Sequence, residues 1–83
     1  MLYTVYILYS QPHKKIYIGY TLHLIERFKS HNSLGTKGWT IKFRPWQVIY
    51  CEYYPDKSEA MSREKILESA KGREWIHQKL KFS

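Results

Sequence analysis

Residues 2–9 are the segment that most limits what this chain can fold into. The eight residues LYTVYILY are all leucine, β-branched or aromatic, a composition that favours a β-strand. Because polar residues do not alternate with apolar ones, both faces of this strand need to be covered, which places it at the centre of a sheet. A chain of 83 residues buries only about 60 to 65% of its unfolded surface, enough for one small core. We therefore expect a single domain over residues 1–83.

The remainder of the chain predicts two further strands and three helices. After a turn over residues 10–15, the expected elements are a strand over 16–20, a helix over 21–32, a long connection over 33–46, a strand over 47–54, a helix over 56–70 and a short helix over 74–80. Thr21 is placed to cap the first helix, residues 56–59 (DKSE) have the pattern of a capping box, and Gly72 is expected to break or bend the second helix. This order predicts a small α/β (α+β) fold in which helices flank a three-stranded, largely antiparallel sheet.

The positive charge is concentrated in the first part of the chain. The formal net charge is +7. Residues 1–51 carry seven Lys or Arg and a single acid, Glu26, whereas the lysines and arginines of residues 52–83 are nearly balanced by acids. Such a field favours a polyanionic partner, most often nucleic acid. The alternative is a solvated surface that keeps a small protein soluble.

Cysteine usage and hydropathy indicate where the protein works. Cys51 is the single cysteine, so no internal disulfide can form, which suits a reducing compartment. The sequence has no run of about 18 apolar residues and no signal-peptide core. We therefore expect a cytoplasmic protein.

Two tyrosines fall on the strands of the predicted hairpin. Tyr6 and Tyr17 bring their phenols to one site if both side chains emerge on the same face of the sheet. Either tyrosine alone is ordinary in a strand. In the helix that follows, Arg27 and His31 are four residues apart and share one face, an arrangement that by itself is typical of a solvated surface.

Glu64 is unusual because of its neighbours. On a helical wheel it lies within the arc of Ala60, Met61 and Leu67. A carboxylate on an inward face is costly unless it is paired, hydrogen-bonded or bound to a cation. Two interpretations stay open at this point: a partly buried ion pair, for instance with Arg27, and a ligand for a metal ion.

The long connection mixes aromatic and basic side chains, as surfaces that bind single-stranded nucleic acid do. The basic residues are Lys37, Lys42 and Arg44, and the aromatic residues are Trp39, Phe43 and Trp46. The alternative is that Trp39 and Trp46 hold the connection against the core.

Taken together, these features resemble the GIY-YIG nucleases, and among them the small single-domain proteins of bacteria. The matching segments are residues 17–21 (YIGYT), 26–28 (ERF), 31–32 (HN), 44–46 (RPW) and 56–65 (DKSEAMSREK). The resemblance covers about residues 2–70. One departure is the first tripeptide, Thr4-Val5-Tyr6, where the name-giving pattern has Gly and Ile before the tyrosine.

The resemblance implies metal-assisted hydrolysis of phosphodiester bonds. Glu64 would hold one Mg²⁺ or Mn²⁺, a hard ion that needs only one or two carboxylates. Arg27 would bind a phosphate oxygen, and Tyr6 would orient or deprotonate the attacking water. Tyr17 would steady the water or the phosphate, and His31 would lie at the periphery as a phosphate contact or proton carrier.

The substrate implied is nucleic acid, with DNA in repair or recombination favoured, and a partner protein would supply sequence specificity. A different class stays open beside the enzyme: a non-catalytic nucleic-acid-binding module or adaptor with the same fold. Divalent-metal dependence distinguishes the two, because hydrolysis needs the ion whereas electrostatic binding to phosphates is weakened by it.

Overall fold

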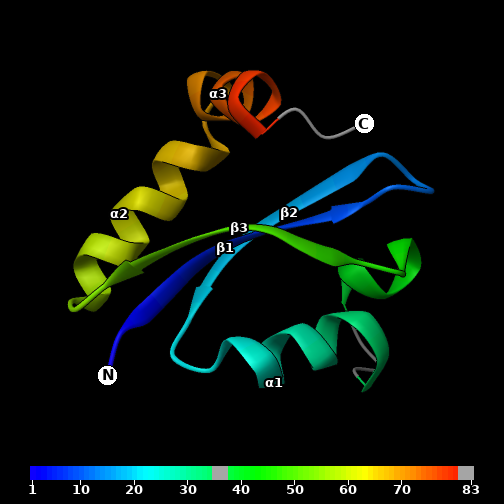
Figure 1. The fold of residues 1–83 in the computed structure, drawn as a ribbon, viewed down its shortest axis with the longest axis horizontal. Helices are drawn as coiled ribbons and strands as arrows, with labels where there is room; N and C mark the ends of the chain where they lie inside the picture. The colour runs from blue at the N-terminus through cyan, green and yellow to red at the C-terminus, as the bar shows by residue number, and fades with distance from the viewer. Residues whose placement is uncertain (35–37, 81–83) are drawn as a thin grey trace.

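The computed structural model describes residues 1–34 and 38–80. Its strands are β1 (Tyr3–Ser10), β2 (Lys15–Thr21) and β3 (Gln47–Tyr54), and its α-helices are α1 (Leu24–Lys29), α2 (Lys57–Glu68) and α3 (Ala70–Leu80). A π-helical turn, η1 (Ser30–Leu34), follows α1, and a 3₁₀ helix, η2 (Trp39–Phe43), precedes β3. Figure 1 shows α2 and α3 on one side of the sheet and α1 on the other.

The three strands form an antiparallel sheet in the order β2-β1-β3. The predicted central strand is therefore confirmed. Val5 and Ile7 of β1 point toward α2 and α3, whereas Tyr6 and Leu8 point toward α1, and all four are fully or almost fully buried. Both faces of β1 are covered, which is why its sequence lacks polar alternation.

Two hydrophobic clusters lie on the two faces of the sheet. The first joins Val5, Ile7 and Ile18 to Ala60 and Leu67 of α2 and to Ile76 of α3. The second is built from Tyr6, Leu8 and Trp46, with Tyr17, Leu24, Phe28, Phe43 and Cys51 packed against it. Functional side chains on the α1 face are thus held by the second cluster.

The first helix is shorter than predicted. It begins at Leu24, and the hydroxyl of Thr21 accepts the backbone N–H of His23 at 3.0 Å, in a turn that precedes the helix. Thr21 was expected at the helix start, so that assignment is wrong. After Lys29 the chain continues as the π-helical turn, which places His31 outside the α-helix.

The connection before β3 is packed more firmly than a loop would be. Trp46 is 3% exposed, and its indole N–H donates to the carbonyl of Thr40 at 2.8 Å. Its backbone N–H donates to Oδ1 of Asn32 at 2.6 Å. Trp46 therefore fastens this connection to the core, as one of the two interpretations predicted.

The start of α2 is predicted correctly, but its capping is not. Asp56 occupies the N-cap position with extended backbone, yet its side chain makes no capping hydrogen bond. The break between α2 and α3 falls at Ser69 rather than at Gly72, because the Ser69 hydroxyl accepts the backbone N–H of Gly72 at 3.1 Å and so caps α3. Gly72 is buried against the end of α2, where a Cβ would collide with the carbonyl oxygen of Ile66.

Across residues 1–34 and 38–80, no helix is both long enough and apolar enough to cross a membrane.

Candidate active site

Tyr6 and Tyr17 meet on the α1 face of the sheet. Tyr6 pairs with Gly19 in the register of β1 and β2, and Tyr17 lies two residues before Gly19 on the same strand face. The ring centroids of the two tyrosines are 6.2 Å apart. The condition set by the sequence, that both side chains emerge on one face, is met.

His31 lies at the centre of the site and is 9% exposed. Its Nε2 is 3.1 Å from the hydroxyl of Tyr6, and its Nδ1 is 2.9 Å from the hydroxyl of Thr40. The Tyr17 ring lies 4.6 Å from the imidazole, centroid to centroid. The expectation that His31 sits at the periphery is wrong, because the π-helical turn directs its ring under the tyrosines instead of along the exposed face of α1.

Arg44 holds this turn in place. Its Nε donates to the carbonyl of His31 at 2.8 Å, and another guanidinium nitrogen donates to the carbonyl of Ser30 at 3.0 Å. The structure therefore gives Arg44 a positioning role.

Arg27 completes the set on the α1 side. It lies in the last turn of α1, is exposed, and lines a cavity of about 230 Å³. The other lining residues are Tyr17, Ser30, His31, Gly38, Trp39 and Thr40. A guanidinium, a phenol and an imidazole thus border one space that is open to a ligand.

Burial sets the protonation of this site. Burial, and then the charge of the Tyr17 phenol, raises the pKa of Tyr6 to about 12, whereas Arg27 acts to lower it. Burial, with the charges of Arg27 and Arg44, lowers the pKa of His31. Near neutral pH, Tyr6 is therefore a neutral phenol and His31 a neutral imidazole.

Glu64 approaches from the opposite side. It lies on α2 between the buried Ala60 and Leu67, and it is half-buried. Burial, and then the charge of Glu68, raises the pKa of its carboxyl, with Lys65 acting in the other direction. Its negative charge also contributes to the raised pKa of Tyr6, as the smallest of the effects there.

An ion pair between Glu64 and Arg27, one of the two interpretations that the sequence left open, is not found among the described residues. The ion pair that forms there joins Arg63 to Glu52. Of the five predicted site residues, four therefore share one cluster: Tyr6, Tyr17, Arg27 and His31. Glu64 affects that cluster through its negative charge, which contributes to the raised pKa of Tyr6.

Glu64 is the carboxylate that a hard divalent ion would find at this site. Within residues 1–34 and 38–80, no three His, Cys, Asp or Glu side chains gather closely enough to form a metal cage. Magnesium keeps most of its waters and needs only one or two carboxylates together with substrate oxygens. A half-buried carboxylate with a raised pKa and no cationic partner among the described residues fits that requirement.

The three residues predicted to contact nucleic acid are Lys37, Lys42 and Arg44, and the two that the structure describes differ in their surroundings. Lys42 is exposed on η2, in keeping with such a role. Arg44 is half-buried and has the positioning role given above, and Lys37 lies outside the described residues. Trp39 is 47% exposed, so of the two tryptophans only Trp46 fastens the connection by burial.

Sequence reasoning missed Thr40 and Gly19 as parts of the site. Thr40 is 6% exposed and fixes the second nitrogen of His31, but nothing in its sequence context indicates this. At Gly19 the Tyr6 ring approaches so closely that a Cβ there would collide with it. A tyrosine paired with a glycine on the neighbouring strand, as Tyr6 is with Gly19, is the sequence signal that could have indicated this contact.

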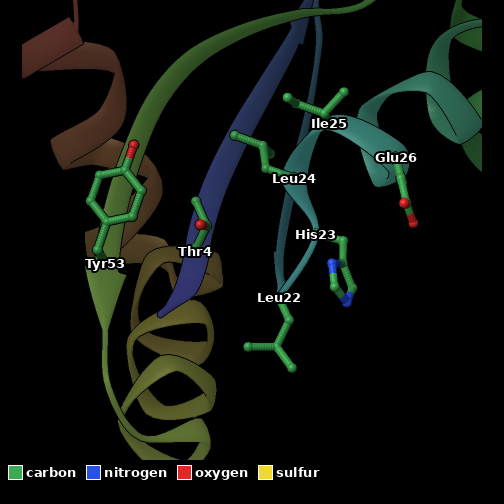
Figure 2. Close-up of a pocket in the computed structure, with 7 residues that line it drawn as sticks. All are labelled: Thr4, Leu22, His23, Leu24, Ile25, Glu26 and Tyr53. Atoms are coloured by element: carbon green, nitrogen blue, oxygen red, sulfur yellow. The ribbon is translucent and has the colours of Figure 1, made fainter. Parts of the chain in front are cut away.

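A separate groove of about 480 Å³ lies between the start of α1 and the end of β3. Figure 2 shows Tyr53 on one side of this groove and His23 and Glu26 on the other, with Thr4 and Leu24 between them. None of the five predicted site residues lines it.

Comparison with known proteins gives a family match and related sequences. A model of the GIY-YIG catalytic domain matches residues 2–79. The structure-specific endonuclease subunit slx1 of Neurospora crassa is 47% identical over 53 residues, which are 58% of this chain and 13% of that protein. A UPF0213 protein of Clostridium perfringens is 37% identical over 60 residues, 72% of this chain and 63% of that protein. The chain thus spans less than two thirds of the length of both.

One solved structure is similar over nearly the whole chain. The solution NMR structure of a UPF0213 protein from Bacillus halodurans matches with a TM-score of 0.57 at 27% sequence identity, over 94% of this chain and 84% of that one. The predicted order of strands and helices is confirmed by this match and by the topology described above.

Proposed function

Because the chain belongs to the GIY-YIG nuclease family, we propose that it is a metal-dependent endonuclease that hydrolyses phosphodiester bonds in nucleic acid, with DNA in repair or recombination as the favoured substrate. The observation that carries the proposal is the hydrogen bond between Tyr6 and His31, beside a cavity that Tyr17, Arg27 and His31 line. Its relative in Neurospora crassa is named a structure-specific endonuclease subunit, which supports this reaction class.

Arg27 is the residue proposed to bind the scissile phosphate. Its guanidinium is exposed at the wall of the cavity, so a phosphate can reach it without rearrangement of the fold. Planar donors match the oxygens of a phosphate and gain strength as negative charge develops during the reaction. Tyr17, on the same wall, has a hydroxyl that orients either the phosphate or the water.

Tyr6 is proposed to position the attacking water through its hydrogen bond to His31. A neutral imidazole has one N–H donor and one acceptor nitrogen. If Nδ1–H donates to Thr40, then Nε2 accepts from the Tyr6 hydroxyl, whose oxygen stays available to accept a proton from water. The water proton would pass to the Tyr6 oxygen as the phenol proton passes to Nε2, which leaves hydroxide to attack phosphorus and a protonated His31.

This arrangement explains why a raised pKa of Tyr6 is compatible with catalysis. A phenol with a pKa of about 12 is a poor base when it has to hold a negative charge. With His31 as the acceptor, the phenol exchanges one proton for another and no phenolate accumulates. The lowered pKa of His31 keeps its acceptor nitrogen unprotonated near neutral pH.

Glu64 is proposed to hold the divalent ion, Mg²⁺ or Mn²⁺. When bound, such an ion supplies positive charge that stabilises the phosphate oxygens and the leaving oxygen. The negative charge of the carboxylate is among the causes that raise the pKa of Tyr6, which supports a role for Glu64 at the same site.

The second candidate is a nucleic-acid-binding module without catalysis, and the exposure of Trp39 favours it. An aromatic ring that is 47% exposed beside basic residues serves binding alone as well as it serves an enzyme. A module of this kind has no need of the buried hydrogen bonds that join Tyr6, His31 and Thr40.

The decisive experiment compares Glu64→Gln with Glu59→Gln. Both variants remove one negative charge from α2, but Glu59 is exposed in its first turn. Purified protein is assayed on single-stranded, duplex, flapped and four-way substrates with Mg²⁺, Mn²⁺ or EDTA. We expect Glu64→Gln to abolish cleavage, to leave binding nearly unchanged and to keep or raise the melting temperature, because it removes a half-buried charge.

The control variant Glu59→Gln should cleave like the parent protein. If Glu64→Gln also cleaves like the parent, the role of Glu64 is wrong. If the parent protein binds these substrates but cleaves none of them with either ion, the binding-module interpretation replaces the nuclease.

A further inference from the structure

A second cavity lies next to the cavity that Tyr17, Arg27 and His31 line, and Trp39 forms part of the wall of both. This cavity of about 340 Å³, called here the basic cleft, is lined by Lys14, Lys15, Ile16, Trp39, Arg73 and His77. Its walls come from the end of the β1–β2 hairpin, from η2 and from α3, and Figure 1 shows the hairpin reaching out between α3 and the green segment that contains η2.

The basic cleft is suited to anions. Lys14, Lys15 and Arg73 contribute three positive charges, and no carboxylate is among its lining residues. Nε of Arg73 donates to the carbonyl of Glu68 at 3.4 Å, which ties the guanidinium to the end of α2. Nζ of Lys15 lies 5.4 Å from the centre of the Phe43 ring. Two of the three cations are therefore oriented by their neighbours.

The hairpin wall is also fixed in position. The His13 and Phe43 rings pack in a T-shaped arrangement, with 5.5 Å between centroids. Together with the contact of Lys15 to the same ring, this holds the hairpin end against η2. The spacing between the lysines and Trp39 is thus set by packing.

Trp39 is held in place but not covered. Its ring lies 4.6 Å from Phe43 and 5.9 Å from Trp46, and it stacks at 29° to Tyr17 with 6.5 Å between centroids. The side chain is nevertheless 47% exposed. A large aromatic surface that is rigid and open to solvent beside cations is the arrangement on which unpaired bases stack.

We propose that the basic cleft and Trp39 form a second nucleic-acid subsite that binds a single-stranded segment next to the cleavage site. Phosphates of that segment bind Lys14, Lys15 and Arg73, and one base stacks on Trp39. The strand then continues past Trp39 into the cavity of Tyr17, Arg27 and His31. The inference rests on the proposed function for the identity of the ligand as nucleic acid.

The choice of a single strand follows from Trp39. In a duplex the faces of the bases are covered by their neighbours, so an exposed indole finds an unstacked base only in single-stranded or frayed segments. The lysines and the arginine alone would bind the backbone of either form. The subsite therefore predicts that substrates with a single-stranded portion bind more tightly than blunt duplexes of the same length.

Binding in EDTA tests the subsite without any cleavage. The probe is a fluorescein-labelled single-stranded DNA of 12 nucleotides, and the comparison is a blunt duplex of the same sequence. We expect Lys15→Ala and Arg73→Ala each to weaken single-strand binding and to reduce the slope of log Kd against log salt by about 0.7, the value for one phosphate contact on a single strand. Lys71→Ala is the matched control, because Lys71 is exposed on α3, the helix that carries Arg73, and lies outside the basic cleft.

Trp39→Leu tests the stacking contribution. We expect it to weaken single-strand binding by a factor of about 5 to 150, the range for losing one stacked base, with a smaller effect on the duplex. Trp39→Phe keeps an aromatic face and should restore part of the loss. Circular dichroism of each variant confirms that it is folded.

The results separate this inference from the proposed function. If Lys15→Ala and Arg73→Ala bind like Lys71→Ala, or if Trp39→Leu weakens duplex and single strand equally, the subsite is overturned even when the parent protein is an active nuclease. If the losses follow the expected pattern, the subsite stands even when the parent protein cleaves none of the substrates.

Discussion

The ring of Tyr6 lies over Gly19 of the neighbouring strand, so closely that a Cβ on Gly19 would be 2.6 Å from the Tyr6 hydroxyl and 2.8 Å from its Cζ. The two residues are paired in the register of β1 and β2. Tyr6 is 1% exposed, which leaves its ring little room to move away. The glycine therefore gives the phenol the space it needs to reach His31.

Gly19→Ala should damage both stability and cleavage. The added methyl overpacks a buried site, which costs about 1 to 3 kcal/mol, and it displaces the Tyr6 hydroxyl from Nε2 of His31. Chemical denaturation and single-turnover cleavage measure the two effects. In a Tyr6→Phe background the stability cost should be smaller, because the closest contact is removed. An equal cost in both backgrounds would mean that the Tyr6 hydroxyl is not what Gly19 accommodates.

Arg27→Ala should lower the cleavage rate by a factor of roughly 10² to 10³, the scale for losing one donor that stabilises the transition state. Because Arg27 is exposed, the melting temperature should change little. Lys29→Ala is a suitable comparison, since it removes a positive charge from an exposed position of the same helix, α1, outside the cavity that Tyr17, Arg27 and His31 line. Equal rates for the two variants would assign the effect of Arg27 to general charge.

Cleavage should weaken at acidic pH through His31. Protonated His31 has no acceptor nitrogen for the Tyr6 hydroxyl, and its pKa is lowered by burial and by Arg27 and Arg44. The rate should therefore be constant through the ordinary histidine value of 6.5 and fall only below it. Stability should fall in the same direction, because the unfolded chain binds the proton more readily than the native state does. A rate that already falls at pH 7 would contradict this assignment.

Thr40→Val should slow cleavage by removing the hydroxyl that fixes the orientation of His31. The hydrogen bond between Nδ1 of His31 and the Thr40 hydroxyl is 2.9 Å long and buried, so the valine side chain leaves Nδ1 without this partner. We expect a two- to tenfold lower rate, about the value of one neutral hydrogen bond. Thr40→Ser, which keeps the hydroxyl, is the control and should restore most of the rate. A rate for Thr40→Val equal to that of the parent protein would show that His31 needs no such support.

The sequence predicted the sheet more reliably than the site. The residue types of a segment determine its preference for a strand, so the central position of β1 and the bounds of β3 could be inferred from residue types alone. The π-helical turn after α1 has no comparable local signal, and it moves His31 from an exposed face to the interior. Ser69 was overlooked as the cap of α3 because Gly72, three residues later, offers a stronger sequence signal for a break.

The position of Glu64 relative to the tyrosines could not be predicted from the sequence, for a different reason. Its helical position predicted an inward carboxylate, and the half-buried side chain agrees. Helix periodicity cannot tell which face of the sheet α2 covers, so the distance between Glu64 and the tyrosines could not be inferred from spacing. It is the packing of Ala60 and Leu67 on Val5 and Ile18 that places α2 opposite α1.

Loss of Glu52 should weaken the attachment of α2 to the sheet. Its carboxylate accepts hydrogen bonds from the hydroxyls of Tyr50 and Tyr54 on its own strand and from Arg63 of α2, whose Nε is 2.8 Å from Oε1. The guanidinium of Arg63 in turn lies 5.4 Å from the centre of the Trp75 ring on α3. One carboxylate thus connects β3 to both C-terminal helices.

Glu52→Gln removes the charge that these donors share and should cost about 1 to 3 kcal/mol in free energy of unfolding, the range for leaving buried donors unsatisfied. Burial opposes ionisation of Glu52, but Arg63 and the two tyrosine hydroxyls outweigh it and lower its pKa below 4.5. The native state then binds fewer protons than the unfolded chain, so this stabilisation is complete above pH 4.5 and is lost as the pH falls through the lowered pKa. Urea denaturation from pH 7 to pH 3 measures the free energy of unfolding. This free energy should fall with pH in the parent protein and in Glu59→Gln, and it should fall less in Glu52→Gln. Equal pH dependence in all three proteins would mean that the Glu52 cluster does not couple protonation to folding.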